Sequence, residues 1–206
     1  IAGDPATSGY TDATGASARF TLPAGIALDA AGNIYITEQS KFTIRKVTPA
    51  GVVTTWLGVN GTAGTTEGVG AAARLFNPTA LCFDGTDTLF LIDNFRVRII
   101  TVSTNTIAAL AGSNGFSGVT DGTGAAARFN IAGANLGGLW WQSARSLLVV
   151  FSPNNANTLM LVREVTLGGV VTTATVNGTI TLGGGIFGNT AGLLGLTGAT
   201  VGVVNI

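Results

Sequence analysis

One short loop is written three times along this 206-residue chain. Its three copies read DATGASARF, EGVGAAARLFN and DGTGAAARFN, at residues 12–20, 67–77 and 121–130. The arginines of the copies, Arg19, Arg74 and Arg128, are 55 and 54 residues apart. A fixed period of this length indicates a repeat architecture, in which each unit buries its apolar surface against its neighbours. The repeat therefore constrains the fold more than any other feature of the sequence.

Each loop also carries an acidic residue seven positions before its arginine, namely Asp12, Glu67 and Asp121. We expect each arginine to pair with its own loop acid or to bind loop carbonyls, because a guanidinium donates five hydrogen bonds. The alternative is a ring of repeated charges that binds a charged ligand. A catalytic site normally needs different residues in different repeats, so the repetition favours the structural role.

Other segments recur in step with the loop. GIALDAAGNIYITE (25–38) is echoed by ALCFDGTDTLFLID (80–93) and GLWWQSARSLLVVFS (138–152). IRKVTPAGVVTT (44–55) returns as VREVTLGGVVTT (162–173), with a looser copy, IITVSTNTIAAL, at 99–110. Each unit thus holds four short apolar segments between turn residues, which is typical of strands. In the first unit the four segments are Gly25–Asp29, Asn33–Thr37, Thr43–Thr48 and Val52–Trp56.

Four antiparallel strands repeated about every 54 residues predict an all-β β-propeller, with helix content near zero. The chain is interpreted as one propeller segment, 1–206, with units 1–56, 57–110 and 111–176 and a partial unit 177–206. Ile1–Gly3 is similar to the end of a unit, as at Leu110–Gly112, and residues 189–206 can be laid over 22–38. The chain is therefore expected to open with the end of one blade and to close with the start of another.

The run from Asp12 through Phe20, together with LPAGIALDAAGNIYITE and IRKVTPAGVVTT, resembles the NHL-repeat family of β-propellers. The resemblance covers about residues 1–176. It implies a scaffold used mostly for binding, with six blades in the usual ring. This chain supplies about three and a half blades, so the resemblance implies an incomplete ring that further chain, further copies or a partner would close.

The charge and residue content exclude several classes of function. Only 10% of the residues are charged, with ten basic and ten acidic side chains, which argues against a nucleic-acid partner. The chain has no histidine, so catalysis by a histidine base is excluded and the usual zinc, copper and haem ligands are depleted. Cys82 is the single cysteine and is expected to be a buried apolar residue. One carboxylate per loop is too few for calcium, so we expect no metal and no cofactor.

Two groups of residues are candidates for a site. Trp140 and Trp141 are adjacent on an expected strand, so one faces the core while the other can stack on a sugar or anchor a partner. The acids that end the first and second strands of the first two units are Asp29, Asp84, Glu38 and Asp93. Turn-forming roles are favoured for these four acids. In the rival interpretation, an enzyme of the lyase or lactonase kind, Asp29 and Asp84 would face an axial channel.

The C-terminal segment carries no charged residue from Val165 to Ile206. Exposed strands usually carry charges that prevent edge-to-edge pairing. We therefore expect 165–206, including Val201 and Val203, to be covered by another copy, another protein or further chain. The alternative is a low-complexity surface stretch. No apolar run is long enough for a membrane-spanning helix.

The function that these features favour is a non-enzymatic interaction or structural module of an extracellular, cell-surface or virion-surface assembly, such as an adhesin, fibre, appendage or sheath. Low charge and abundant Thr, Gly and Ala suit such a role. Carbohydrate is a second candidate partner beside protein. The lyase or lactonase interpretation remains the alternative.

Overall fold

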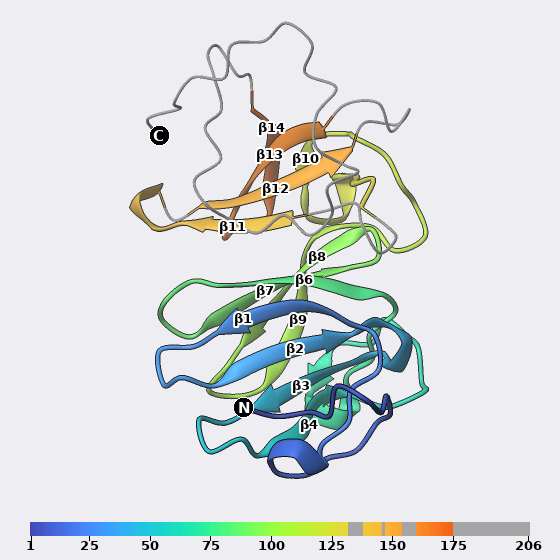
Figure 1. Cartoon of the computed structure of the whole chain (residues 1–206). Helices are drawn as coiled ribbons and strands as arrows, with labels where there is room; N and C mark the ends of the chain where they lie inside the picture. Colours follow the sequence, from blue (N-terminus) through green and yellow to red (C-terminus); the bar gives the residue numbers. More distant parts are fainter. Residues whose placement is uncertain (132–137, 146, 154–159, 175–206) are drawn as a thin grey trace, which may run out of the picture.

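The computed structural model describes residues 1–131, 138–145, 147–153 and 160–174, which form three antiparallel sheets (Figure 1). The first sheet contains β1 (Pro23–Leu28), β2 (Ile34–Glu38), β3 (Thr43–Val47) and β4 (Val53–Gly58). The second contains β6 (Pro78–Phe83), β7 (Thr88–Asp93), β8 (Arg96–Thr101) and β9 (Thr106–Gly112). The third contains β11 (Gly138–Gln142), β12 (Leu147–Pro153), β13 (Met160–Thr166) and β14 (Val170–Thr173). The expected all-β fold of four-stranded antiparallel blades is confirmed.

Each repeated loop adds short elements to its own blade. The two-residue strands β5 (Gly68–Val69) and β10 (Gly122–Thr123) pair with β9 and β14, so two of the sheets gain a fifth strand. Each loop also contains one turn of 3-10 helix: η1 (Gly15–Ser17), η3 (Gly70–Ala72) and η4 (Gly124–Ala126). Two more such turns, η2 (Gln39–Lys41) and η5 (Ser143–Arg145), follow β2 and β11. The expectation of almost no helix overlooked these turns, three of which begin at a glycine with positive φ.

The outermost strands end at a glycine in the same conformation. β4 and β9 end at Gly58 and Gly112, two residues beyond the expected unit ends, with φ of 88° and 92°. Gly3 has a φ of 98° and lies one repeat length before Gly58. Positive φ is a conformation that glycine adopts without strain. Ile1–Gly3 thus has the conformation in which the outermost strands of the first two blades end.

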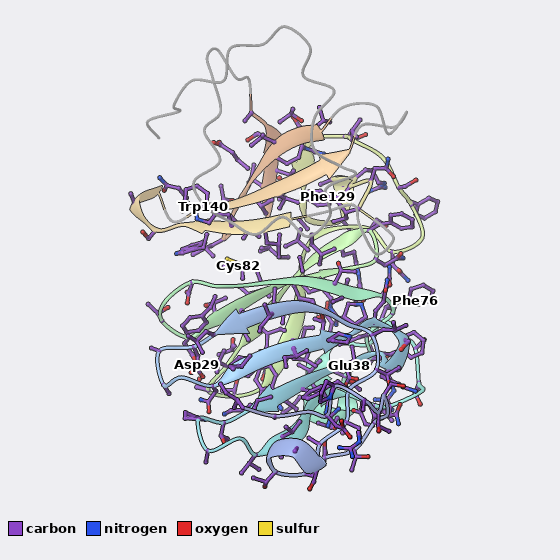
Figure 2. All side chains as sticks on the ribbon, viewed as in Figure 1. Asp29, Glu38, Phe76, Cys82, Phe129 and Trp140 are labelled. Carbon is purple, nitrogen blue, oxygen red and sulfur yellow. The ribbon has the colours of Figure 1, made fainter. Side chains whose placement is uncertain are left out.

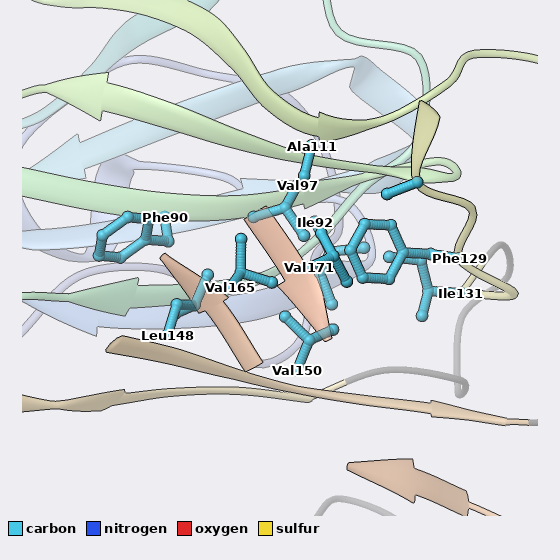
Figure 3. Packing of buried hydrophobic residues seen from close by; sticks show 11 residues of the cluster. Phe90, Ile92, Val97, Ala111, Phe129, Ile131, Leu148, Val150, Val165 and Val171 are labelled. Carbon is cyan, nitrogen blue, oxygen red and sulfur yellow. The ribbon is translucent and has the colours of Figure 1, made fainter. Parts of the chain in front are cut away.

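The blades pack face to face, with the inner strands β1, β6 and β11 next to one another (Figure 1). The core between the first two blades joins Tyr35, Ile44 and Leu57 of the first to a set from the second: Leu75, Leu81, Leu89, Leu91, Ile100 and Ile107. The core between the second and third blades contains Phe90, Ile92, Phe129, Leu148 and Val150 (Figure 3). We call the side of a blade that meets the preceding blade its leading face, and the opposite side its trailing face. Burial of each large side chain stabilises the stack by about 1.5–3 kcal/mol.

The first two blades approach most closely near their inner strands. A Cβ placed on Gly25 would lie 2.0 Å from the carbonyl oxygen of Thr79. The Thr37 hydroxyl donates to that same oxygen at 2.7 Å and accepts the backbone N–H of Gly25 at 2.7 Å. Only glycine leaves room for this contact between β1 and β6.

Part of the expectation for the uncharged C-terminal segment is wrong. Val165 and Val171 are buried by the chain itself, in the core between the second and third blades. Val170 is exposed because it precedes Val171 on β14 and faces the opposite side, and Leu167 is exposed in the turn after β13. Residues 165–174 therefore need no second molecule to cover their apolar side. Residues 175–206, including Val201 and Val203, lie outside the described residues.

Candidate functional site

The three loop arginines lie at equivalent places and bind carbonyl oxygens of their own loops. Arg19 Nη1 donates to Ala16 O at 2.6 Å and to Ala18 O at 2.8 Å. Arg74 and Arg128 repeat this pattern with the oxygens of Ala71, Ala73, Ala125 and Ala127. Each arginine thus closes a 3-10 turn. Arg19 also pairs with Asp4 at 3.1 Å, outside the repeated motif.

The loop acids instead bind the outermost strand of their own blade. Asp12 accepts the backbone N–H of Thr55 at 2.8 Å, Glu67 that of Ala109 at 2.9 Å, and Asp121 that of Thr173 at 2.8 Å. Asp12 and Asp121 also pair with an arginine, but it is Arg45 at 2.5 Å and Arg163 at 2.7 Å. Of the two kinds of partner expected for each loop arginine, the structure shows the loop carbonyls, while the loop acid binds elsewhere. The motif therefore holds the loop against the sheet at two separate points.

The third strand of each blade supplies an arginine that sequence analysis missed. Arg45, Arg98 and Arg163 are fully buried. Each donates to the carbonyl of its loop arginine and to that of the residue before its loop acid, at 2.8–3.2 Å. The guanidinium of Arg45 also lies 4.3 Å from the ring centre of Tyr10, a cation–π contact. The signal was present, since IRKV and VREV set Arg45 and Arg163 at one repeat position.

The inner carboxylate that meets the buried arginine differs between blades. Glu38 pairs with Arg45 at 2.6 Å, and Asp93 pairs with Arg98 at 3.0 Å. Both acids also accept backbone N–H groups from the residues that precede the inner strand. They are buried anchors and not turn formers, which corrects the role favoured for them from the sequence. In the third blade Ser152 stands at this register position.

Asp29 and Asp84 have the turn-forming roles expected of them. Asp29 accepts the N–H groups of Ala31 and Asn33, and Asp84 those of Thr86 and Thr88. Burial alone would raise the pKa of each carboxyl, but these hydrogen bonds outweigh it and hold the pKa below its usual value. A carboxylate stabilised in this way is a poor proton acceptor.

The two adjacent tryptophans lie on opposite sides of β11. Trp141 stacks on Phe90 of the second blade with ring centres 5.2 Å apart, so it belongs to the core between blades. Trp140 points the other way and is 51% exposed. Cys82 lies under β11 against the backbone of Trp141, and burial raises the pKa of its thiol to about 11 (Figure 2). Of the candidate site residues that the structure describes, Trp140 is therefore the one with a large free apolar surface.

Two further classes of site were sought in the described part of the chain. No group of three or more acidic, cysteine or histidine residues there is placed to hold a metal ion. None of the helices in that part has the length and apolar character needed to cross a membrane.

Comparison with known proteins supports the fold. No family model matches the sequence, and no curated protein matches it. An auxiliary nutrient binding protein from Bacteroides thetaiotaomicron superposes with a TM-score of 0.54 and 20% identity, over 73% of this chain and 37% of that chain. An auxiliary nutrient binding protein from Bacteroides ovatus superposes with a TM-score of 0.51 and 21% identity, over 76% of this chain and 36% of that chain. A chain of the nidogen/laminin complex superposes with a TM-score of 0.50 and 15% identity, over 76% of this chain and 49% of that chain.

These likenesses define the class of the fold. The chain is an all-β protein of β-propeller type, and it spans less than half of the length of each of these three structures. Within this fold, the repeated acids and arginines fasten each loop to its own blade. Among the residues that the structure describes, Ile26 and Leu28 on β1 and Trp140 on β11 expose large apolar side chains.

Proposed function

We propose that this chain is an NHL-type propeller segment that acts as a non-enzymatic interaction or structural module of an extracellular, cell-surface or virion-surface assembly. Adhesins, fibres, appendages and sheaths are assemblies of this kind. The observation that carries the proposal is the different placement of the charged and the large apolar side chains. The repeated charged residues pair within the blades, whereas large apolar side chains such as Ile26, Leu28 and Trp140 are exposed.

The exposed apolar residues supply the recognition surface in this proposal. Ile26 and Leu28 on β1 are 67% and 59% exposed, and Trp140 on β11 is 51% exposed. Ile26 and Leu28 share one face of their strand because they are two residues apart. Exposed apolar groups that lie together are typical of protein contact surfaces, and aromatic residues are frequent anchors there.

The NHL assignment is supported by the repeated geometry of the loop. Its arginine closes a 3-10 turn and its acid holds the outermost strand in all three blades. The low charge of the chain and its uncharged segment from Val165 onward support a site in a larger assembly outside the cell. The proposed partner is other copies of the chain or another protein, and carbohydrate stacked on Trp140 is the second candidate.

Two assays test this proposal against the rival enzyme. The full chain is incubated with a panel of lactones and esters, with and without added divalent metal ions, and we expect no turnover above buffer. Turnover that disappears in Asp29→Asn or Asp84→Asn at an unchanged melting temperature would establish the enzyme instead. In the second assay the chain is passed over immobilised polysaccharides. Retention that is lost in Trp140→Ala but kept in Leu167→Ala would identify carbohydrate as the partner.

A further inference from the structure

The connections that lead from the first blade to the second and from the second to the third contain the same dipeptide. Asn60–Gly61 and Asn114–Gly115 lie 54 residues apart, which is one repeat length. In an Asn–Gly pair the backbone nitrogen of the glycine can attack the side-chain amide of the asparagine, because glycine has no Cβ to obstruct the approach. The two copies are therefore two candidate sites for the same chemical change to the chain.

Both dipeptides lie in a tight turn of the same kind. In each turn the residue after the glycine donates its backbone N–H to the carbonyl oxygen of the residue before the asparagine, at 3.0 Å in the first copy and 3.5 Å in the second. Gly61 and Gly115 have φ of 75° and 83°, as the third position of a type II turn requires. Asn60 and Asn114 are both exposed, so water reaches both turns. The local geometry alone therefore favours neither copy.

The two copies differ in their contacts with the preceding blade, and in the first copy the attacking nitrogen is bound. The backbone N–H of Gly61 donates to the carbonyl oxygen of Lys41 in η2 at 3.2 Å. The nitrogen must lose this proton in order to attack, so the hydrogen bond has to break first. Loss of one hydrogen bond of ordinary strength slows such a step by about two- to tenfold. The contact with Lys41 therefore protects the Asn60 amide.

In the second copy the contact is made to the amide and not to the nitrogen. Asn94 stands two residues before β8, as Lys41 stands two residues before β3, and its Nδ2 donates to Asn114 Oδ1 at 3.2 Å. Within the described part of the chain no acceptor binds the N–H of Gly115, which is exposed. A hydrogen bond donated to an amide oxygen stabilises the negative charge that develops there when a nucleophile attacks the carbon. The second copy therefore has a free nitrogen and an activated amide.

We propose that Asn114 is a site of spontaneous modification, at which the folded chain converts asparagine to aspartate and isoaspartate, whereas Asn60 is protected. The Gly115 nitrogen loses its proton to water and forms a bond to Cγ of Asn114. The side-chain nitrogen then takes up a proton and leaves as ammonia. Water opens the resulting succinimide at either carbonyl, which gives aspartate or isoaspartate. Each event replaces an amide by a carboxylate and adds one negative charge to a chain whose formal net charge is zero.

Incubation of the full 206-residue chain at mildly alkaline pH tests the proposal. Peptide mapping by mass spectrometry follows each Asn–Gly pair separately, because the change from amide to carboxyl alters the mass of its peptide. Asn177–Gly178, outside the described residues, yields a peptide of its own. In the folded chain we expect conversion at Asn114 to be roughly tenfold faster than at Asn60. Asn114→Gln should abolish conversion at that position, because the larger ring closes much more slowly.

The same incubation in concentrated urea is the control for the neighbouring residues in the sequence. Both contacts are lost there, so Asn60 and Asn114 should convert at similar rates. A tenfold difference that persists in urea, or conversion at Asn60 that matches Asn114 in the folded chain, would overturn the proposal.

A variant of Asn94 tests the contact that activates the amide. Asn94→Asp retains the size of the side chain and its tolerance of a φ of 60°, but a carboxylate cannot donate to Asn114. We expect conversion at Asn114 to slow by about two- to tenfold, with conversion at Asn60 unchanged. A rate at Asn114 that stays the same or rises would overturn the role assigned to Asn94.

Discussion

Arg45 and Glu38 meet at 2.6 Å, and neither side chain has any exposed surface. The same guanidinium reaches Asp12 at 2.5 Å and donates to the carbonyl oxygens of Thr11 and Arg19. One side chain on β3 therefore joins the second strand and the loop that precedes β1. Removal of one partner from a buried pair leaves an uncompensated charge, at a cost of about 3–5 kcal/mol.

The first prediction compares the two arginines of the first blade. Arg45→Met is expected to lower the free energy of unfolding by about 3–5 kcal/mol, because Glu38 is left buried without its cation. Arg19→Met is the matched control, since Arg19 and its partner Asp4 are partly exposed. Its loss should be about 1 kcal/mol. Urea denaturation measures the free energy of unfolding of both variants. Equal losses would contradict the expected difference between the buried and the partly exposed arginine.

Much of the fold could be predicted because its signals are local. Turn residues and β-branched runs place the strands, and the observed bounds of β1–β4 differ from the expected ones by at most two residues. The repeat also predicted that Ile1–Gly3 would look like the end of a blade, and Gly3 has the positive φ of Gly58 and Gly112. These features depend on the residue itself and on its near neighbours.

The ion-pair network could not be predicted in the same way, because it depends on which distant segments meet. The sequence places Asp12 close to Arg19, but Asp12 pairs with Arg45, which lies 33 positions further along. The loosest copy of the repeat was also misaligned. The sequence comparison made Ile99 equivalent to Ile44, whereas the strand register makes Val97 equivalent to Ile44. That shift of two residues concealed the equivalence of Arg98 with Arg45 and Arg163.

The second prediction concerns acid. Burial alone would raise the pKa of Asp121, but hydrogen bonds from Thr173 and the charge of Arg163 outweigh it and lower the pKa. A carboxyl with a lowered folded-state pKa stabilises the protein above its unfolded pKa of about 4, and this contribution is lost as the pH falls through the folded value. The melting temperature should therefore decline below about pH 4 in the wild type.

Asp121→Asn isolates the contribution of that one group. The variant should melt at a lower temperature than the wild type at neutral pH, and the difference should shrink as the pH falls below about 4. Scanning calorimetry across this range gives both curves. A difference that stays constant with pH would show that Asp121 contributes no titrating charge to stability.

The third prediction tests the contact between inner strands. Gly25→Ala places a methyl group 2.0 Å from the Thr79 carbonyl, so β1 and β6 must move apart. We expect a loss of about 1–3 kcal/mol, as for other overpacked sites. Gly168→Ala is the control, because its nearest neighbour is the Thr166 hydroxyl at 3.8 Å. That change should be neutral or stabilising by up to about 1 kcal/mol. Equal melting temperatures for the two variants would refute the close approach.

The last prediction uses Cys82 as a probe of the contact between the second and third blades. Burial raises the pKa of its thiol to about 11, and the side chain lies against the backbone of Trp141. At pH 8 roughly one thiol in a thousand is then ionised, compared with roughly a quarter of free cysteine, and the thiolate is the reactive form. Labelling of the native protein by a disulfide reagent should therefore be at least about 100-fold slower than labelling in denaturant. Trp141→Ala removes the ring that stacks on Phe90, the residue paired with Cys82 across β6 and β7, and should accelerate labelling of the folded protein, whereas Trp140→Ala, on the opposite side of β11, should change it little. Fast labelling of the folded wild type would show that the two blades do not close over Cys82.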